Sequence, residues 1–297
     1  MTNDTATGSD IKLPIRPKAL AFDLDGTLLD YEGTLTPDVE KAVKFMTASG
    51  LKVFLVTGRL QPSCEKYWRR LGLDTPMASC NGARVGYPDK PPIFHRPVSA
   101  AARSIIMDIE KANGLYVNYY VDTTVYTVTD APERQWYTDH FSPVVLAESL
   151  EQIAAMDLPT KCLCIVPEKD HPAVSAIFQG ALGDEADVTA SNSRFIELLS
   201  AGANKAEGLR QLVAWSGIPI EEFVAVGDGL NDLPMLQAAG FSITFSSGDP
   251  RLVDHVDMVL PPLWESGMDL LARVVLGMTD SGRFLTARSQ RFFRKKP

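Results

Sequence analysis

Short apolar runs alternate with helical patterns along much of this chain, and this alternation constrains its fold more than any other feature. One run ends with Ala21 to Leu24 and enters a glycine turn at Gly26. Two further runs, Lys52 to Gly58 and Phe223 to Gly229, also end in glycine turns. Strand-like runs that alternate with helices are typical of parallel sheets covered by helices. We therefore expect an α/β protein whose core is a doubly wound, Rossmann-like parallel sheet.

The helical segments carry recognisable end signals. Thr36 is a candidate N-cap, Pro37 suits the first helical position, and Gly50 is a candidate stop for the helix between them. Further elements are expected as helices at 62–71, 205–215 and 233–239 and, at 77–82, as a short strand running into a turn.

The middle of the chain has an alternation of its own. Helical patterns near Ala100 to Ala112 and Pro172 to Leu182 accompany β-rich runs, and no linker rich in glycine, serine or proline marks the boundaries. This pattern predicts an α+β domain inserted in one loop of the core. The expected order is a disordered N-terminus at 1–15, core at 16–86, inserted domain at 87–190, core at 191–280 and a basic tail at 281–297.

The charge balance and the absence of targeting signals limit the possible partners. With 29 basic and 37 acidic residues the formal charge is −8, so a general binder of nucleic acid or acidic membranes is not expected. The start of the sequence lacks the pattern of a secretory signal, and no run of about 18 apolar residues is present to span a membrane. We expect a cytoplasmic protein.

The cysteines indicate structural thiols. None of the four forms a CxxC pair. Cys162 and Cys164 lie two apart in KCLCIV, which predicts a strand with both thiols on one face. Buried, reduced thiols agree with a cytoplasmic location.

The first run ends in a pair of acids, Asp23 and Asp25. Residues two apart in extended chain face the same side, so two carboxylates can meet in one small volume. Their repulsion is relieved by a hard cation such as Mg²⁺. Asp23 could then attack phosphorus while Asp25 exchanges a proton with the leaving oxygen. A calcium loop does not fit, because Thr27 and Leu28 stand where its third acid and glycine belong. The structural alternative is a pair of loop caps.

Two further features follow in order. The hydroxyl of Thr57 and the amides of Gly58 and Arg59, after the second run, could hold phosphate oxygens, although a strand ending in Thr-Gly is also a common turn. Lys205 begins a helix, where a cation does not complement the helix dipole. That position favours an anionic partner, and an ordinary surface lysine is the alternative.

A second acidic segment, Gly227 to Asp232, follows the last of these runs. Asp228, Asp232 and the amide of Asn231 are enough to complete a magnesium site. A helix cap explains Asn231 and Asp232 but does not account for Asp228. Because the carboxyl ends of parallel strands line a common crevice, these features can converge there. The chain has no glycine-rich nucleotide loop and no nucleophile elbow to compete with this interpretation.

Together these motifs resemble a known family. AFDLDGTLL, LVTGR, Lys205 and GDGLND are similar to the four motifs of the haloacid dehalogenase superfamily. The NGA at Asn81 to Ala83 and the wording GDGxND resemble its Cof-type phosphatase branch, which is close to sugar-phosphate phosphatases with a large αβ cap. Too few residues separate Asp25 from Thr57 to form a cap, whereas the stretch from Thr57 to Lys205 has room for one, as in that branch.

The resemblance implies specific roles for the acids. Asp23 would form an aspartyl-phosphate, and Asp25 would act as general acid and then as the base for water. Magnesium would be held by the Asp23 carboxylate, the Asp25 backbone carbonyl and Asp228, with Asp232 in support.

The resemblance also implies where the substrate binds. The phosphoryl group would contact the phosphate-binding candidates Thr57, Gly58, Lys205 and Asn231, of which Thr57 and Lys205 also count as catalytic. The substrate-binding candidates are Arg59, Asn81 and Gly82.

The expected function is magnesium-dependent hydrolysis of a small phosphorylated metabolite, a sugar phosphate being one class, by a monomer or homodimer. A phosphomutase of the phosphomannomutase type and a catalytically silent protein that binds phosphorylated ligands are the alternatives. One departure leaves the substrate subgroup open: after the fourth motif such relatives read approximately GVAMGNA, whereas this chain reads FSITFSSGDP.

Overall fold

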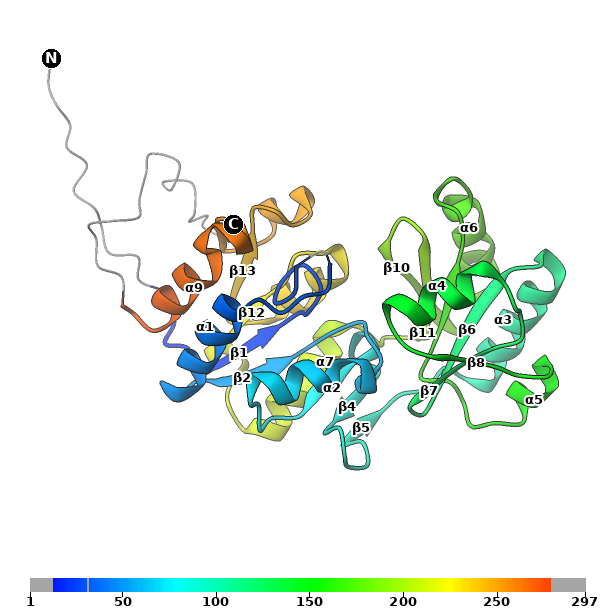
Figure 1. Ribbon diagram of the computed structural model, residues 1–297, viewed down its shortest axis with the longest axis horizontal. Coiled ribbons are helices and arrows are strands. Elements are labelled where there is room, and N and C mark those ends of the chain that lie inside the picture. The colour runs from blue at the N-terminus through cyan, green and yellow to red at the C-terminus, as the bar shows by residue number, and fades with distance from the viewer. Residues whose placement is uncertain (1–12, 31, 279–297) are drawn as a thin grey trace, which may run out of the picture. The chain divides into compact units, whose positions relative to one another are not determined.

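The computed structural model describes residues 13–30 and 32–278 (Figure 1). The basic tail predicted at 281–297 lies outside the described residues, as does most of the N-terminal segment predicted to be disordered. The chain forms two compact units. Of the described residues, the first comprises 13–30, 32–54, Arg70–Leu73 and 216–278, and the second comprises Leu55–Arg69 and Asp74–Trp215.

The first unit is built on a five-stranded sheet. The strand order is β14-β13-β12-β1-β2, with β1 at Ala19–Phe22, β2 at Lys52–Leu55, β12 at Phe223–Val226, β13 at Phe241–Phe245 and β14 at Met258–Leu260. The pairs β1–β12, β12–β13 and β13–β14 are all parallel. Every residue of β1 and β12 is buried, as expected for strands covered on both faces. The predicted α/β class with a parallel core sheet is confirmed.

Helices cover this sheet with the predicted end signals. Helix α1 (Pro37–Ala48) begins after Thr36, whose hydroxyl accepts a 3.4 Å hydrogen bond from the amide of Val39. Gly50 follows the helix with a φ of 94°, a conformation that favours glycine. Helix α9 (Met268–Val275) packs beside α1 (Figure 1), and the short α8 (Leu233–Ala238) packs on β12 and β13.

The second unit contains two sheets. The larger has the order β10-β11-β9-β6-β7-β8, formed by Ala186–Asn192, Phe195–Ser200, Lys161–Ile165, Tyr116–Val121, Thr124–Thr127 and Val144–Leu146. All of its pairs are antiparallel except β7–β8. The smaller sheet joins β3 (Met77–Ser79), β4 (Arg84–Gly86) and β5 (Phe94–His95). The domain bounds expected from the sequence stay a prediction.

Each face of the larger sheet has its own apolar core. Helices α3 (Ala100–Asn113) and α6 (His171–Leu182) pack against the face that carries Cys162 and Cys164. Both thiols are free and buried, which confirms the prediction for this strand. The opposite face carries Leu163 and packs with α4 (Pro132–His140). The remaining α-helices of the described residues are α2 (Gln61–Leu71), α5 (Leu150–Ala154) and α7 (Lys205–Ser216).

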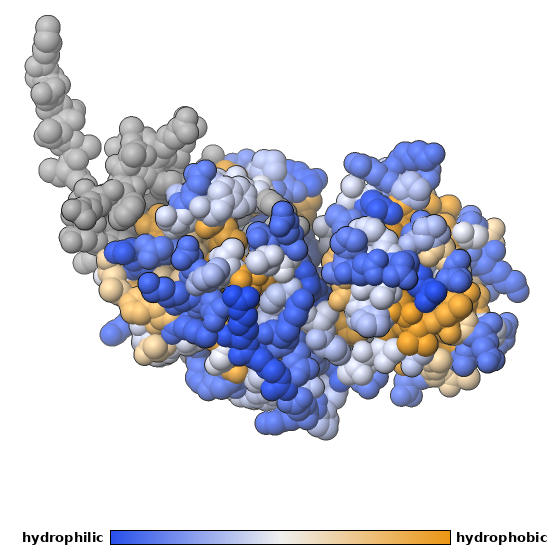
Figure 2. All heavy atoms as spheres, viewed as in Figure 1, coloured by the Kyte–Doolittle hydropathy of each residue, from blue (hydrophilic) through white to orange (hydrophobic). Residues whose placement is uncertain are grey.

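The surface is consistent with the composition. In the view of Figure 2 the exposed side chains are mostly hydrophilic, with smaller apolar patches on both units. None of the helices within 13–278 has the length and apolar character needed to cross a bilayer.

Candidate active site

Three carboxylates of the first unit meet at the ends of two paired strands. Asp23 follows β1, whereas Asp228 and Asp232 follow β12, and one oxygen from each lies within 4.8 Å of the others. The amide of Asp23 donates a 3.0 Å hydrogen bond to the carbonyl of Val226, which continues the β1–β12 pairing up to the site. Because β1 and β12 are parallel neighbours, residues at their carboxyl ends lie together. The convergence of these three predicted residues is thereby shown.

This group suits a hard divalent cation. Asp23 and Asp232 are buried, and Asp228 is partly buried. Carboxylates this close repel one another, and burial makes their charge more costly. A cation with a preference for oxygen ligands relieves both costs, and three carboxylate oxygens are a donor set that Mg²⁺ accepts.

Backbone contacts hold the acidic loop in shape. One carboxylate oxygen of Asp232 accepts hydrogen bonds from the amides of Asp228 (3.0 Å) and Gly229 (2.9 Å). Asp232 therefore caps the loop, as the alternative interpretation expected, and also belongs to the acidic group. Asn231 lies in the same turn, Leu230–Asp232, and is partly exposed.

Three residues that contact Asp228 were missed by the sequence reasoning. The hydroxyl of Thr27 donates a 3.1 Å hydrogen bond to Asp228 Oδ1. Gly248 lies so close that a Cβ atom there would be 2.8 Å from the Asp228 carbonyl, and the amide of Asp249 donates to that carbonyl at 2.7 Å. The unusual FSSGDP segment thus supports Asp228. The only signal in the sequence was that this segment departs from the family's usual wording.

Asp25 is placed differently from the other acids. Its carboxylate is exposed and does not belong to the group of three. The adjoining Gly26 has a φ of 76°, and a Cβ atom there would lie 2.1 Å from Asp228 Oδ2. Glycine at this position lets the turn approach the acidic group closely. An exposed carboxylate beside the group is suited to exchanging protons.

In the second unit, the turn Thr57 to Arg59 is held by backbone contacts. Thr57 is fully buried, and its amide donates a 2.9 Å hydrogen bond to the carbonyl of Ala78. Its hydroxyl accepts a 3.2 Å hydrogen bond from the amide of Arg59. The side chain of Asn81 lies directly beside Gly58, where a Cβ atom would be 3.0 Å from Asn81 Oδ1. Four of the predicted phosphate- and substrate-binding residues are therefore neighbours here.

Lys205 lies at the start of a helix that packs closely against Gly82. It is the first residue of α7 and is fully buried, which contradicts the alternative of a surface lysine. Gly82 has a φ of 85°, and a Cβ atom there would meet the Asn204 carbonyl at 2.3 Å and the Gly208 amide nitrogen at 2.7 Å. This close approach holds the start of α7. The phosphate-binding role of Lys205 stays a prediction.

Arg59 lies among aromatic side chains. Its guanidinium is 5.5 Å from the ring centroid of Tyr67 and 5.7 Å from that of Phe141. Both distances are within the range of cation–π attraction. These contacts orient Arg59, whose substrate role stays a prediction.

Comparison with known proteins shows the family of this chain. A family model described as haloacid dehalogenase-like hydrolase matches residues 20–268. The chain is 28% identical over 244 residues to the 5-amino-6-(5-phospho-D-ribitylamino)uracil phosphatase YitU of Bacillus subtilis (strain 168), covering 78% of this chain and 88% of that protein. It is 26% identical over 259 residues to the pyridoxal phosphate phosphatase YbhA of Escherichia coli (strain K12), covering 82% and 93%.

Solved structures share the fold. A haloacid dehalogenase-like hydrolase from Bacteroides thetaiotaomicron superposes with a TM-score of 0.77 at 20% identity, covering 87% of this chain and 98% of its own. The subclass IIB sugar phosphatase BT4131 superposes with a TM-score of 0.75 at 20% identity, covering 87% and 99%. The chain therefore belongs to the haloacid dehalogenase-like hydrolases, within their Cof-type phosphatase branch.

Proposed function

We propose that this protein is a magnesium-dependent phosphomonoesterase that hydrolyses a small phosphorylated metabolite through an aspartyl-phosphate on Asp23. The observation that carries the proposal is the group formed by Asp23, Asp228 and Asp232. The two phosphatases reported above, each aligned over most of its length, support hydrolysis as the reaction.

The acidic group would hold the metal. Asp23 and Asp228 would each contribute a carboxylate oxygen and Asp232 would support the loop, and the resemblance to the family adds the backbone carbonyl of Asp25. Bound Mg²⁺ supplies positive charge that lowers the repulsion between the carboxylates and the substrate phosphate.

The reaction has two steps. A carboxylate oxygen of Asp23 attacks phosphorus as the bond from phosphorus to the ester oxygen breaks, while Asp25 donates a proton to that oxygen. Asp25 then accepts a proton from water, which attacks the phosphorus of the aspartyl-phosphate. Inorganic phosphate leaves and the Asp23 carboxylate is restored. The exposure of Asp25 allows this exchange with solvent and with the leaving group.

The phosphoryl oxygens are bound by residues of several motifs. By their match to the family motifs, the ammonium of Lys205, the hydroxyl of Thr57, the amide of Gly58 and the side chain of Asn231 would balance the negative charge in the transition state. Arg59 and Asn81, beside the phosphate turn, contact the leaving group of the substrate.

The substrate class can be narrowed by direct assay. BT4131 is named a sugar phosphatase, whereas YitU and YbhA are named for phosphate esters that carry a nitrogen heterocycle. A panel of sugar phosphates, pyridoxal phosphate and 5-amino-6-(5-phospho-D-ribitylamino)uracil covers both groups. Purified protein with Mg²⁺ is expected to release inorganic phosphate from at least one member. Isomerised sugar phosphate without phosphate release would favour a mutase, and binding without turnover would favour a silent binder.

A further inference from the structure

A buried ion pair of the second unit lies beside the phosphate turn. Lys161 of β9 and Glu197 of β11 are each 3% exposed at their side chains, and Lys161 Nζ lies 3.0 Å from Glu197 Oε1. Glu197 is directly opposite Leu163 in the antiparallel register, so Lys161, two residues before Leu163, is its diagonal neighbour on the same face. Neither residue belongs to the four family motifs.

The pair is bonded to the turn and to Asn81. Lys161 Nζ also donates a 2.9 Å hydrogen bond to the carbonyl of Gly58. Oε1 of Glu197 accepts from the hydroxyl of Ser191 at 3.1 Å, and its Oε2 accepts from the side-chain amide of Asn81. Replacing a buried ion pair by apolar side chains is often neutral or stabilising. Stability alone is therefore a weak explanation for these two charges.

The hydrogen bonds fix three successive peptide groups. The carbonyl of Thr57 accepts a hydrogen bond from the amide of Asn81, and the carbonyl of Gly58 accepts one from Lys161 Nζ. The carbonyl of Arg59 accepts one from the amide of Cys80, and each of the three bonds is 2.9 Å long. The described chain contains no cis peptide bond, so each N–H points opposite to the carbonyl of its own peptide group. The three hydrogen bonds to these carbonyls therefore also set the direction in which the N–H groups of Gly58, Arg59 and Leu60 point.

Lys161 reaches the Thr57 hydroxyl through a single peptide group. It holds the Gly58 carbonyl, and the N–H of that same peptide is the Arg59 amide, which donates to Thr57 Oγ1 at 3.2 Å. A positive charge at the carbonyl polarises the peptide and strengthens the bond donated by its N–H. Glu197 acts on the other side of the turn, because it holds Asn81, whose backbone amide holds the Thr57 carbonyl.

Lys161 remains charged in this position. Burial lowers the pKa of its ammonium, but the carboxylate of Glu197 and other nearby groups more than offset this, so the pKa is raised above its usual value. The ring of Tyr120, whose centroid lies 4.9 Å from Nζ, adds a cation–π contact.

We propose that Lys161 and Glu197 are positioning residues of the phosphate site, which orient the Thr57–Arg59 turn and the side chain of Asn81. This inference rests on the proposed function, since it assumes that the turn binds the phosphoryl group. Neither residue touches the substrate. Their effect passes through the Gly58–Arg59 peptide and through Asn81.

The first test removes the ammonium but keeps the length of the side chain. Lys161→Met is compared with the exposed control Lys169→Met for kcat and KM on p-nitrophenyl phosphate and for the Kd of inorganic phosphate by calorimetry. We expect kcat/KM to fall and the phosphate Kd to rise roughly 10- to 100-fold in Lys161→Met, as for other supporting contacts of a site. The Mg²⁺ concentration for half activation should stay within about twofold, because the acids are untouched. A merely structural role would lower the melting temperature without changing the phosphate Kd of the folded protein.

A second variant tests the proposal even if Lys161→Met does not fold. Lys161→Met combined with Glu197→Leu leaves no unpaired buried charge, so we expect it to fold with a melting temperature near that of the wild type. We also expect the same loss of phosphate affinity. Wild-type phosphate affinity in this double variant overturns the proposal. Failure of both variants to fold also overturns it, because the pair is then a structural requirement. A wild-type protein that neither binds phosphate nor hydrolyses any ester overturns the proposed function itself, and this inference with it.

Discussion

At the scale of single residues, the acidic side chains of the first unit have different environments and therefore different capacities. Asp23 is buried within the group of three, whereas Asp25, two residues later, is exposed to solvent. A carboxylate beside a cation stays ionised and can attack an electrophile, and one in water can pick up and release protons. The proposed division of labour, attack by Asp23 and proton transfer by Asp25, is based on this difference.

The first prediction concerns Asp23→Asn. The amide has nearly the shape of the carboxylate but lacks the charge and the nucleophilic oxygen, so phosphate release should fall at least ~10⁴-fold. The exposed control Asp108→Asn should retain full activity. Steady-state phosphate release, with circular dichroism to confirm folding, is the measurement. Substantial residual turnover in Asp23→Asn would show that Asp23 is not the nucleophile.

The second prediction concerns Glu110, which is buried in the apolar core of the second unit. Burial raises the pKa of its carboxyl to about 7, opposed by the hydrogen bond that the Tyr119 hydroxyl donates at 2.5 Å. The folded state therefore favours the protonated form. Its contribution to stability is present below about pH 4.5 and is lost as the pH rises through 7. The total loss is ~3 kcal/mol at most.

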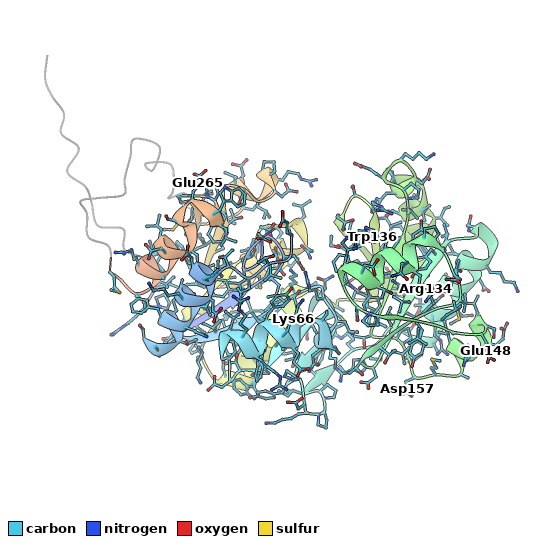
Figure 3. All side chains as sticks on the ribbon, viewed as in Figure 1. Lys66, Arg134, Trp136, Glu148, Asp157 and Glu265 are labelled. Atoms are coloured by element: carbon cyan, nitrogen blue, oxygen red, sulfur yellow. The ribbon has the colours of Figure 1, made fainter. Side chains whose placement is uncertain are left out.

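Glu110→Gln removes this titration while keeping the shape of the side chain. Its free energy of unfolding, relative to that of the wild type, should increase between about pH 5 and pH 8. Denaturant unfolding at both pH values measures the difference. The exposed Glu148→Gln, labelled in Figure 3, is the matched control and should show no such trend. An unchanged difference for Glu110→Gln would show that this carboxyl does not titrate in that range.

At the scale of elements, local patterns predicted most helices and strands, but not how they contact. The caps of α1 and the start of α7 lie at the predicted residues, because capping signals act within a few positions. The short strand running into a turn that was expected at 77–82 is present: β3 ends at Ser79, and Cys80 and Asn81 then take left-handed backbone conformations. These conformations are uncommon for residues other than glycine, and tertiary hydrogen bonds to the Thr57–Arg59 turn hold them.

The third prediction belongs to this scale and concerns Gly82, which seats the start of α7. Gly82→Ala places a Cβ atom in contact with Asn204 and Gly208 at a left-handed φ of 85°. The control Gly114→Ala also has a left-handed φ, 60°, but a Cβ atom there meets nothing within 4 Å. Both variants should lose roughly 1–2 kcal/mol of stability from the backbone conformation. Only Gly82→Ala should also lose catalytic efficiency, because α7 must shift and carry Lys205 with it. Equal kcat/KM in the two variants would contradict this.

At the scale of the whole molecule, the acidic group joins segments that are far apart in the chain. A ligand that binds only the folded state stabilises it by mass action, by ~2.7 kcal/mol at 100 times its Kd. The fourth prediction is that Mg²⁺ raises the melting temperature of the wild type and that Asp228→Asn abolishes most of this rise. The exposed Asp157→Asn (Figure 3) should keep it. An equal rise in melting temperature with Mg²⁺ in both variants would show that Asp228 does not bind the metal.

Chelator should likewise stop turnover, and added Mg²⁺ should restore it.

The sequence by itself determined the fold class, the carboxyl-end positions of the acids and the shared face of Cys162 and Cys164. These follow from strand period, glycine turns and capping signals, all of which can be recognised within a few residues. Only the tertiary structure decided the contacts that support the site. Thr27 reaches Asp228 across 201 positions, and Lys161 reaches Gly58 across 103. Such contacts depend on strand order and register, which a local pattern does not specify, and the burial of Lys205 depends on a glycine contact of the same kind.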